Sequence, residues 1–145
     1  IYTTIKLIPK LLTSGANDFT NNRYNILAYT DAVQTDTFNL LGGTNTKVPQ
    51  TISGVNQVLD QLEKTTRNFV TAGVFAPGVW SSPDAFGDLD TFNRNIVDNG
   101  FYWIAGDLGG QPQSDRESRK SPVFQGATKL SGAFHSVDII INLNK

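Results

Sequence analysis

The clearest pattern of hydrophobic and polar positions lies at the end of the chain, from Ala133 to Leu143. One set of alternate positions is almost wholly apolar, and the other is mostly polar. The apolar set is Ala133, His135, Val137, Ile139, Ile141 and Leu143. A period of two predicts a β-strand with one apolar face, here extended over roughly 36 Å. Such a terminal strand is prone to aggregate unless it pairs within its own sheet or is donated to another molecule.

Shorter strands are predicted by β-branched and aromatic runs elsewhere. Tyr2 to Ile8 alternates roughly and is bounded by Pro9. Phe101 to Ala105 is a short aromatic run, and Val123 to Leu130 is a further candidate. Because these residue types suit a pleated, half-buried surface, each run is interpreted as a strand.

The strongest helical pattern runs from about Ile52 to Ala72, with Thr51 as its N-cap and Gly73 as its stop. Apolar residues recur at steps of three and four, which predicts one buried face. That face is expected to carry Ile52, Val55, Val58, Leu59, Leu62, Phe69 and Val70.

Two shorter helices are predicted before it, capped by Thr20 and by Thr30, with Gly42-Gly43 as the final stop. Their inner faces are expected to carry Tyr24, Leu27 and Ala28 in the first and Val33, Thr37, Leu40 and Leu41 in the second. Closely spaced turn residues from Gly73 to Gly100 predict a surface loop anchored by Trp80 and Phe86.

Short strands mixed with two or three helices favour an α+β fold, a mixed α/β sandwich in which helices pack on a short β-sheet. The 145 residues correspond to a single domain, in which 132–145 form a long C-terminal strand or arm. Because the chain begins with Ile1 and enters a strand at once, we expect it to be a fragment, or the visible part, of a larger protein.

Composition removes several classes of function. The chain has no cysteine, so it can form neither a disulfide framework nor a thiolate metal site. With 12 basic and 13 acidic residues its net charge is −1, which gives no electrostatic footprint for nucleic acid or an anionic membrane. No apolar run is long enough to span a membrane, and no secretory signal is visible. We therefore expect no nucleic-acid or membrane partner.

Catalytic and metal chemistry has little support. The single histidine, His135, lies in the apolar register of the last strand, and we interpret it as a packed structural side chain. Asp84, Asp88 and Asp90 could suggest a calcium site, but they lack the glycine-centred loop and closing glutamate of such sites. Solvated loop acids are the better interpretation, and no metal or cofactor is expected.

The densest charge cluster is SDRESRK, from Ser114 to Lys120. It predicts a polar helical turn from Gln113 to Lys120 with an ion pair between Asp115 and Arg119. Two interpretations stay open, a solvated turn and an electrostatic contact surface. The residues that would make the contact are Asp115, Arg116, Arg119 and Lys120.

Four blocks together carry a resemblance to a known family. They are YTDAVQTDTFNLL (29 to 41), KVPQTISGVNQVL (47 to 59), VTAGVFAPGVW (70 to 80) and SDRESRKSPVFQGATKLSGAFHSVDIIINLNK (114 to 145). Their order and spacing resemble the C-terminal part of the tail sheath protein of contractile-tailed bacteriophages and prophages. The chain departs from that pattern in a shorter stretch at 9 to 30, a shortened loop or a fragment boundary, and in a longer connection from Leu89 to Asn99.

The resemblance implies a structural protein and not an enzyme. Sheath subunits of this kind surround a rigid tail tube as stacked six-fold rings in a helical sheath, which contracts to drive the tube through a bacterial envelope. Their C-terminal domain lies next to the tube, and terminal arms add strands to neighbouring subunits. The implied partners are further copies of the chain, the tail tube protein, and the baseplate and tail terminator proteins. The implied location is the virion tail, assembled in the host cytoplasm.

Strand donation would also explain the pattern at the end of the chain. We expect the last strand to complete, or be completed by, the sheet of a neighbouring subunit, with Val137, Ile139 and Ile141 turned to an apolar core. The residues predicted for this interface are Val137, Asp138, Ile139, Ile140, Ile141 and Asn142.

Two other classes of function stay open on the sequence. One is a hydrolase-like enzyme that uses the acids at 84 to 90. The other is a soluble binding module that folds its last strand into its own sheet. Negative-stain microscopy separates them from a sheath subunit, which should form tubes or rings.

Overall fold

The computed structural model describes residues 2–7, 20–43, 47–132 and 137–142. In chain order the elements are β1 (Tyr2–Leu7), α1 (Thr20–Gly43), α2 (Ile52–Thr71), α3 (Leu89–Asn99), β2 (Phe101–Ala105), α4 (Gln113–Glu117), β3 (Phe124–Thr128) and β4 (Val137–Asn142). The strands form two antiparallel pairs, β1 with β4 and β2 with β3. The α+β fold expected from the sequence is confirmed.

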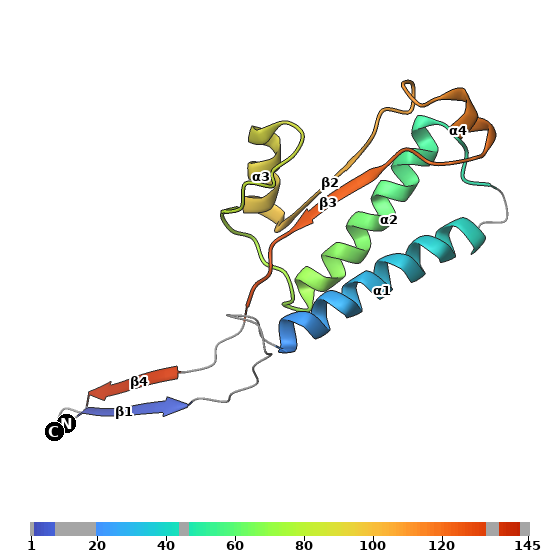
Figure 1. Ribbon diagram of the computed structural model, residues 1–145. Coiled ribbons are helices and arrows are strands. Elements are labelled where there is room, and N and C mark those ends of the chain that lie inside the picture. Colours follow the sequence, from blue (N-terminus) through green and yellow to red (C-terminus); the bar gives the residue numbers. More distant parts are fainter. Residues whose placement is uncertain (1, 8–19, 44–46, 133–136, 143–145) are drawn as a thin grey trace.

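The β2–β3 sheet lies between α2 and α3, and α1 packs on α2 (Figure 1). Tyr102 of β2 packs against the α3 side chain Phe92, while the next residue, Trp103, donates a hydrogen bond from Nε1 to Thr66 of α2 at 2.9 Å. Successive residues of a strand point to opposite faces, so each helix covers its own face of the sheet. Gly126 stands opposite Trp103 in the register, and a Cβ there would lie 2.6 Å from the indole ring.

Helix α2 follows its sequence signals closely. The Thr51 hydroxyl accepts a hydrogen bond from the backbone N–H of Gly54, and Gly73 follows the helix with a left-handed φ of 82°. Val58 and Leu62 are buried as expected. Ile52 is 73% exposed, contrary to the prediction, and the buried face continues instead through Thr65 and Thr66.

Helix α1 is one continuous helix and not the two that the sequence predicted. The Thr30 hydroxyl does not cap a new helix, because it donates to the carbonyl of Ile26, one turn earlier, at 2.9 Å. The predicted inner faces were also wrong in part, because Leu41, assigned to the second of them, is 57% exposed. Tyr24 and Leu27 are exposed, and Tyr29 turns inward, where its ring meets Phe69 and Phe75 edge-on.

The segment from Leu89 to Asn99 is helix α3 and not the loop that the sequence predicted. Asp88 accepts from the backbone N–H of Thr91 as the N-cap, and Gly100 closes the helix with a φ of 83°. Between these caps only Phe92 and Ile96, one turn apart, are fully buried. The segment is rich in Asp and Asn, which are common in turns, so its short amphipathic helical pattern was not recognised from the sequence.

The main apolar core gathers around α3 and the sheet. It is built on Phe92, Ile96 and Ala127. Trp80 and Phe86 lie edge-on to the Phe92 ring, with centroids 5.3 and 5.1 Å away. Both aromatic residues were predicted to anchor this segment, and the packing confirms it.

A buried polar network joins α1, α2 and β2 around Thr66. The Thr66 hydroxyl donates to the carbonyl of Leu62 at 2.8 Å, so the Tyr29 hydroxyl, also at 2.8 Å, donates to it, as Trp103 does. This hydroxyl therefore uses its full capacity of one donor and two acceptor sites. Burial raises the pKa of Tyr29 above its ordinary 10.0, although the polar contacts to Thr66 and Trp103 oppose the shift.

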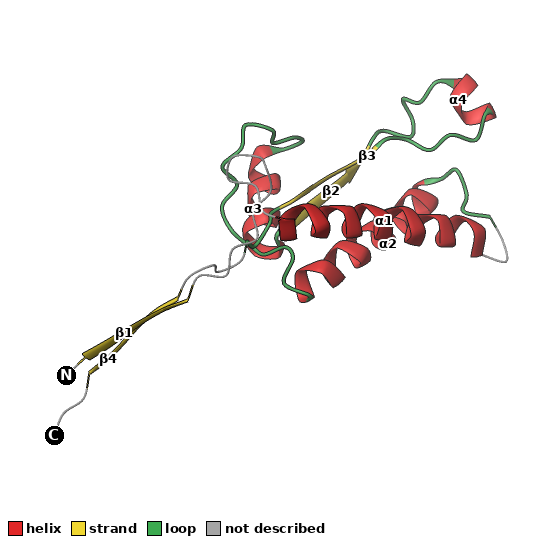
Figure 2. Cartoon of the chain, turned by 60° about the horizontal axis from the view of Figure 1, so that its bottom comes forward, coloured by secondary structure: helices red, strands yellow, loops and turns green. Residues whose placement is uncertain are grey.

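The β1–β4 sheet lies apart from the other elements (Figures 1 and 2). It joins the first and the last described segments of the chain. In the ranges that the structure describes, no helix is both long and apolar enough to cross a lipid bilayer.

Candidate assembly surfaces

The β1–β4 pair is the first candidate surface. The antiparallel register runs from Tyr2 opposite Asn142 to Leu7 opposite Val137. It also places Ile5 opposite Ile139. The alternate positions that carry aliphatic residues in β1 therefore stand opposite those of β4. The strand predicted for Val137 to Asn142 is confirmed as β4, and its partner in this chain is β1.

Each strand of this sheet has one paired edge. Among the described residues no third strand pairs with the outer edge of β1 or of β4. A two-stranded sheet alone is marginally stable, and unpaired edges offer N–H and C=O groups to a further strand. Ala133, His135 and Leu143, which the sequence placed in the same strand, lie outside the described residues.

The charged segment 113–120 is the second candidate surface. Helix α4 is a single turn, and Arg119 follows it with a left-handed φ of 57°. The predicted pair between Asp115 and Arg119 is wrong, because the backbone turns at Arg119 and brings Lys120 to Asp115 instead. The Lys120 ammonium lies 3.3 Å from the Asp115 carboxylate, where both groups remain partly exposed.

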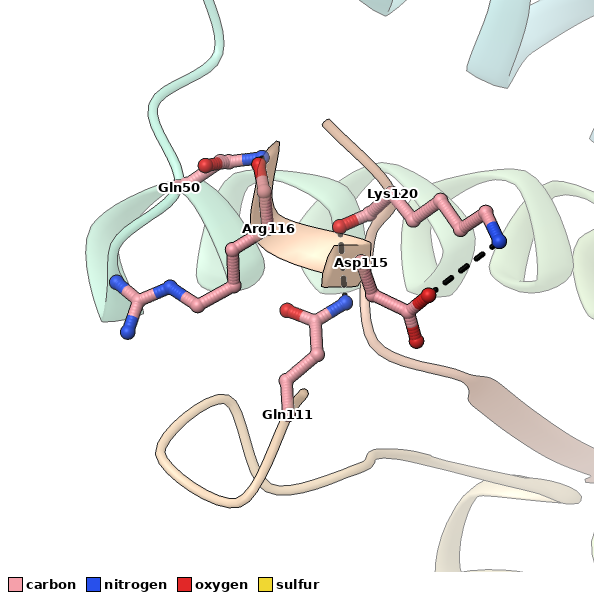
Figure 3. Close-up of polar contacts among 5 residues, drawn as sticks. All are labelled: Gln50, Gln111, Asp115, Arg116 and Lys120. Carbon is pink, nitrogen blue, oxygen red and sulfur yellow. Dashed lines mark hydrogen bonds and ion pairs between the residues drawn. The ribbon is translucent and has the colours of Figure 1, made fainter. Parts of the chain in front are cut away.

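Two glutamines hold this segment in place (Figure 3). Gln50 donates from Nε2 to the carbonyl of Arg116 at 3.0 Å, and Gln111 donates to the carbonyl of Lys120 at 2.9 Å. The Arg116 and Lys120 side chains point away from each other. Nothing in the sequence pattern identified the glutamines, because an amide that bonds a distant carbonyl leaves no periodic signal.

The result is a fixed backbone that presents cations to solvent. Arg116, Arg119 and Lys120 are all exposed, and only Lys120 forms an ion pair within the described part of the chain. All four predicted contact residues are therefore on the surface, around one turn. This geometry suits an acidic partner surface.

The acids that a hydrolase would need do not converge. Asp88 is the N-cap of α3, where hydrogen bonds from the hydroxyl and the backbone N–H of Thr91 lower its pKa. Asp84 accepts from the Ser82 hydroxyl at 3.0 Å. In the described segments no three His, Cys, Asp or Glu side chains gather where they could hold a metal ion.

Comparison with known families gives a match over most of the chain. Residues 21–143 match the family described as "E217 tail sheath protein gp31-like, C-terminal domain". The chain belongs to this tail sheath family. A search of curated proteins gave no match. The matched range begins inside α1 and includes α3, the charged segment and β4.

Membership of a tail sheath family makes this chain a structural component of a phage tail. The family is one of structural proteins and not of enzymes. The family implies oligomeric assembly within the tail. The functional surfaces are therefore those that can contact another subunit.

Proposed function

We propose that the chain is a subunit of a contractile tail sheath that polymerises around the tail tube through the β1–β4 sheet. Stacked hexameric rings of subunits form the sheath, and its contraction drives the tube through a bacterial envelope. The tail tube, baseplate and tail terminator proteins are its partners. The virion tail that contains it is assembled in the host cytoplasm.

The observation that carries this proposal is the β1–β4 sheet with its two open edges. Strand addition to an open edge gives main-chain hydrogen bonds and a defined register. If every subunit receives a strand in the same way, two different surfaces meet at each contact, which is then heterologous. Such contacts extend into an open array when the subunits do not close into a ring. Burying Val137, Ile139 and Ile141 would stabilise the contact by roughly 1.5–3 kcal/mol each, before ordering costs.

Deletion of residues 137–145 tests the strand. The apolar core and the Thr66 network use only residues of the elements from α1 to β3. We therefore expect the truncated protein to remain a folded monomer by circular dichroism and to form no tubes or rings in negative-stain images. Unfolding of the truncated protein, or normal tubes, would show that the strand does not link subunits.

A point substitution tests the same contact with less disturbance. Ile139→Asp places an unpaired charge on the face predicted to be apolar and should prevent assembly. Ile140→Asp is the matched control, because adjacent residues of a strand point to opposite faces. Equal effects of the two substitutions would contradict the predicted apolar face.

The charged segment is proposed as the contact with the tube or with a neighbouring subunit. Reversal of Arg116, Arg119 and Lys120 to Glu should leave the fold intact, since exposed positions tolerate substitution within about 0.5 kcal/mol. Tube formation should weaken, and wild-type assembly should fall with rising salt. Lys64→Glu with Arg94→Glu, two exposed cations on α2 and α3, is the control. Unchanged assembly of the triple variant would exclude the segment from the interface.

The binding-module alternative keeps one observation in its favour, because β4 pairs with β1 of its own chain. The two functions predict different particles. Isolated globules at high protein concentration, with and without the tail tube protein, would favour the binding module and contradict the sheath.

A further inference from the structure

Helix α1 carries an exposed apolar stripe on the side that faces away from α2. Its four large side chains are exposed by 70% at Tyr24, 70% at Leu27, 74% at Phe38 and 57% at Leu41. Their spacing places them along one face of the helix. Asp31, also exposed, lies on this face between the two apolar pairs.

The opposite side of α1 is already occupied. Tyr29 reaches the Thr66 hydroxyl, and Asp36 accepts from the Thr65 hydroxyl at 2.7 Å. The helix is therefore apolar on both sides but packed on only one. A helix with this distribution usually lies between two partners.

A groove between α2 and β2 offers a complementary surface. It has a volume of about 720 Å³ and lies between the first half of α2 and the end of β2 with the loop that follows. Its apolar lining comes from Ile52, Val55, Leu59, Ile104 and Leu108. Arg116 of the charged segment is also among the residues that line it.

The stripe and the groove cannot meet within one chain. The α2 residues that face α1 include Gln61, Lys64 and Asn68, which line a crevice with Asp36. The stripe lies on the side of α1 that faces away from α2, so it cannot reach a groove that α2 forms with β2 of the same chain. An apolar ridge and a groove at separate places on one subunit can build an open array from identical copies.

We propose that the α1 stripe of one copy docks into the α2–β2 groove of a second copy, with Asp31 opposite Arg116. The apolar side chains fill the groove as helix anchors, and the charge pair fixes their register. The proposal rests on the proposed sheath function, because it supplies the contact between subunit bodies that the β1–β4 strands do not make.

Cross-linking tests the contact directly, since the chain contains no cysteine of its own. Phe38→Cys and Ile52→Cys in one full chain should give a ladder of multimers with a short bismaleimide, because each copy carries both halves of the contact. Phe38→Cys with Val97→Cys, which uses an exposed residue of α3, is the matched control and should give no ladder. Absence of the Phe38–Ile52 ladder would overturn the proposal, as would dimers from Phe38→Cys alone, which would mean that two stripes pair with each other.

A charge exchange tests the register. Asp31→Arg and Arg116→Asp, each added to the double-cysteine chain, should lower the ladder yield roughly tenfold, and the two together should restore it. No recovery in the combined variant would overturn the Asp31–Arg116 pairing. If Phe38→Glu abolished binding to the tail tube protein while no ladder formed, the tube would be the occupant of the stripe.

The docking contact and the sheath function are tested separately by these outcomes. Tubes in negative-stain images without a ladder would overturn the docking contact and leave the sheath function standing. A ladder without tubes would support the contact and contradict the sheath function.

Discussion

Replacement of Thr66 by valine isolates the buried polar network. Valine matches threonine in shape and β-branching, so the change removes hydrogen bonds without opening a cavity. The indole N–H of Trp103 and the hydroxyl of Tyr29 both lose their acceptor at Thr66. A buried donor left without a partner costs about 1–3 kcal/mol.

The expected loss of stability follows from the burial of the two donors. Tyr29 and Trp103 are only half-buried, so water can partly replace the lost acceptor. We therefore expect Thr66→Val to lower the free energy of unfolding by about 2–4 kcal/mol. At ~2–4 °C per kcal/mol for a chain of this length, the Tm should fall by roughly 5–15 °C.

Urea denaturation followed by tryptophan fluorescence measures this loss. Low protein concentration keeps assembly from adding to the apparent stability. Thr71→Val, at an exposed threonine of the same helix, is the control and should stay within about 0.5 kcal/mol of wild type. A Thr66→Val variant as stable as the control would contradict this prediction, because the network would then contribute no more stability than hydrogen bonds to water.

Two further predictions concern single sites. Because the pKa of Tyr29 is raised in the folded state, its contribution to stability is fully present below the ordinary value of 10.0 and is lost as the pH rises through the raised value. Tyr29→Phe should therefore flatten the alkaline decline of stability in urea denaturation across that range, and a slope equal to wild type would contradict the assignment. Gly54→Ala should destabilise the fold by about 2–4 kcal/mol, because the new Cβ would lie 1.8 Å from the Pro49 carbonyl oxygen. Ser53→Ala, at the exposed neighbouring position, should leave the Tm nearly unchanged in thermal denaturation.

Elements with one dominant period were predictable from the sequence. The caps Thr51 and Gly73 delimit α2, and Phe101 to Ala105 forms a strand with the bounds that its aromatic run predicted. The alternation around Ile139 predicted β4. Here local propensity and burial point to the same structure.

The failures arise where two patterns overlap. Helix α1 has apolar residues on both sides, so Tyr24 and Leu27 were assigned to the core when Tyr29 occupies it. Thr65 and Thr66 are buried polar residues, and a search for apolar periodicity passes over them. The groove and the contact between Gln50 and Arg116 depend on chain segments far apart in sequence, which periodicity cannot relate. The pair between Lys120 and Asp115 is local, but it depends on the left-handed backbone at Arg119, which helical spacing does not predict.

The β1–β4 register would have a mechanical consequence in the contractile sheath proposed above. Leu7 stands opposite Val137, so the chain leaves β1 and enters β4 at the same end of the sheet. A force transmitted from the rest of the subunit therefore pulls both strands together along their length. If neighbouring strands hold the outer edges, that force loads the perpendicular hydrogen bonds in shear and all at once, and does not peel them apart one by one. Such a joint would resist tension while the subunit bodies change their relative positions.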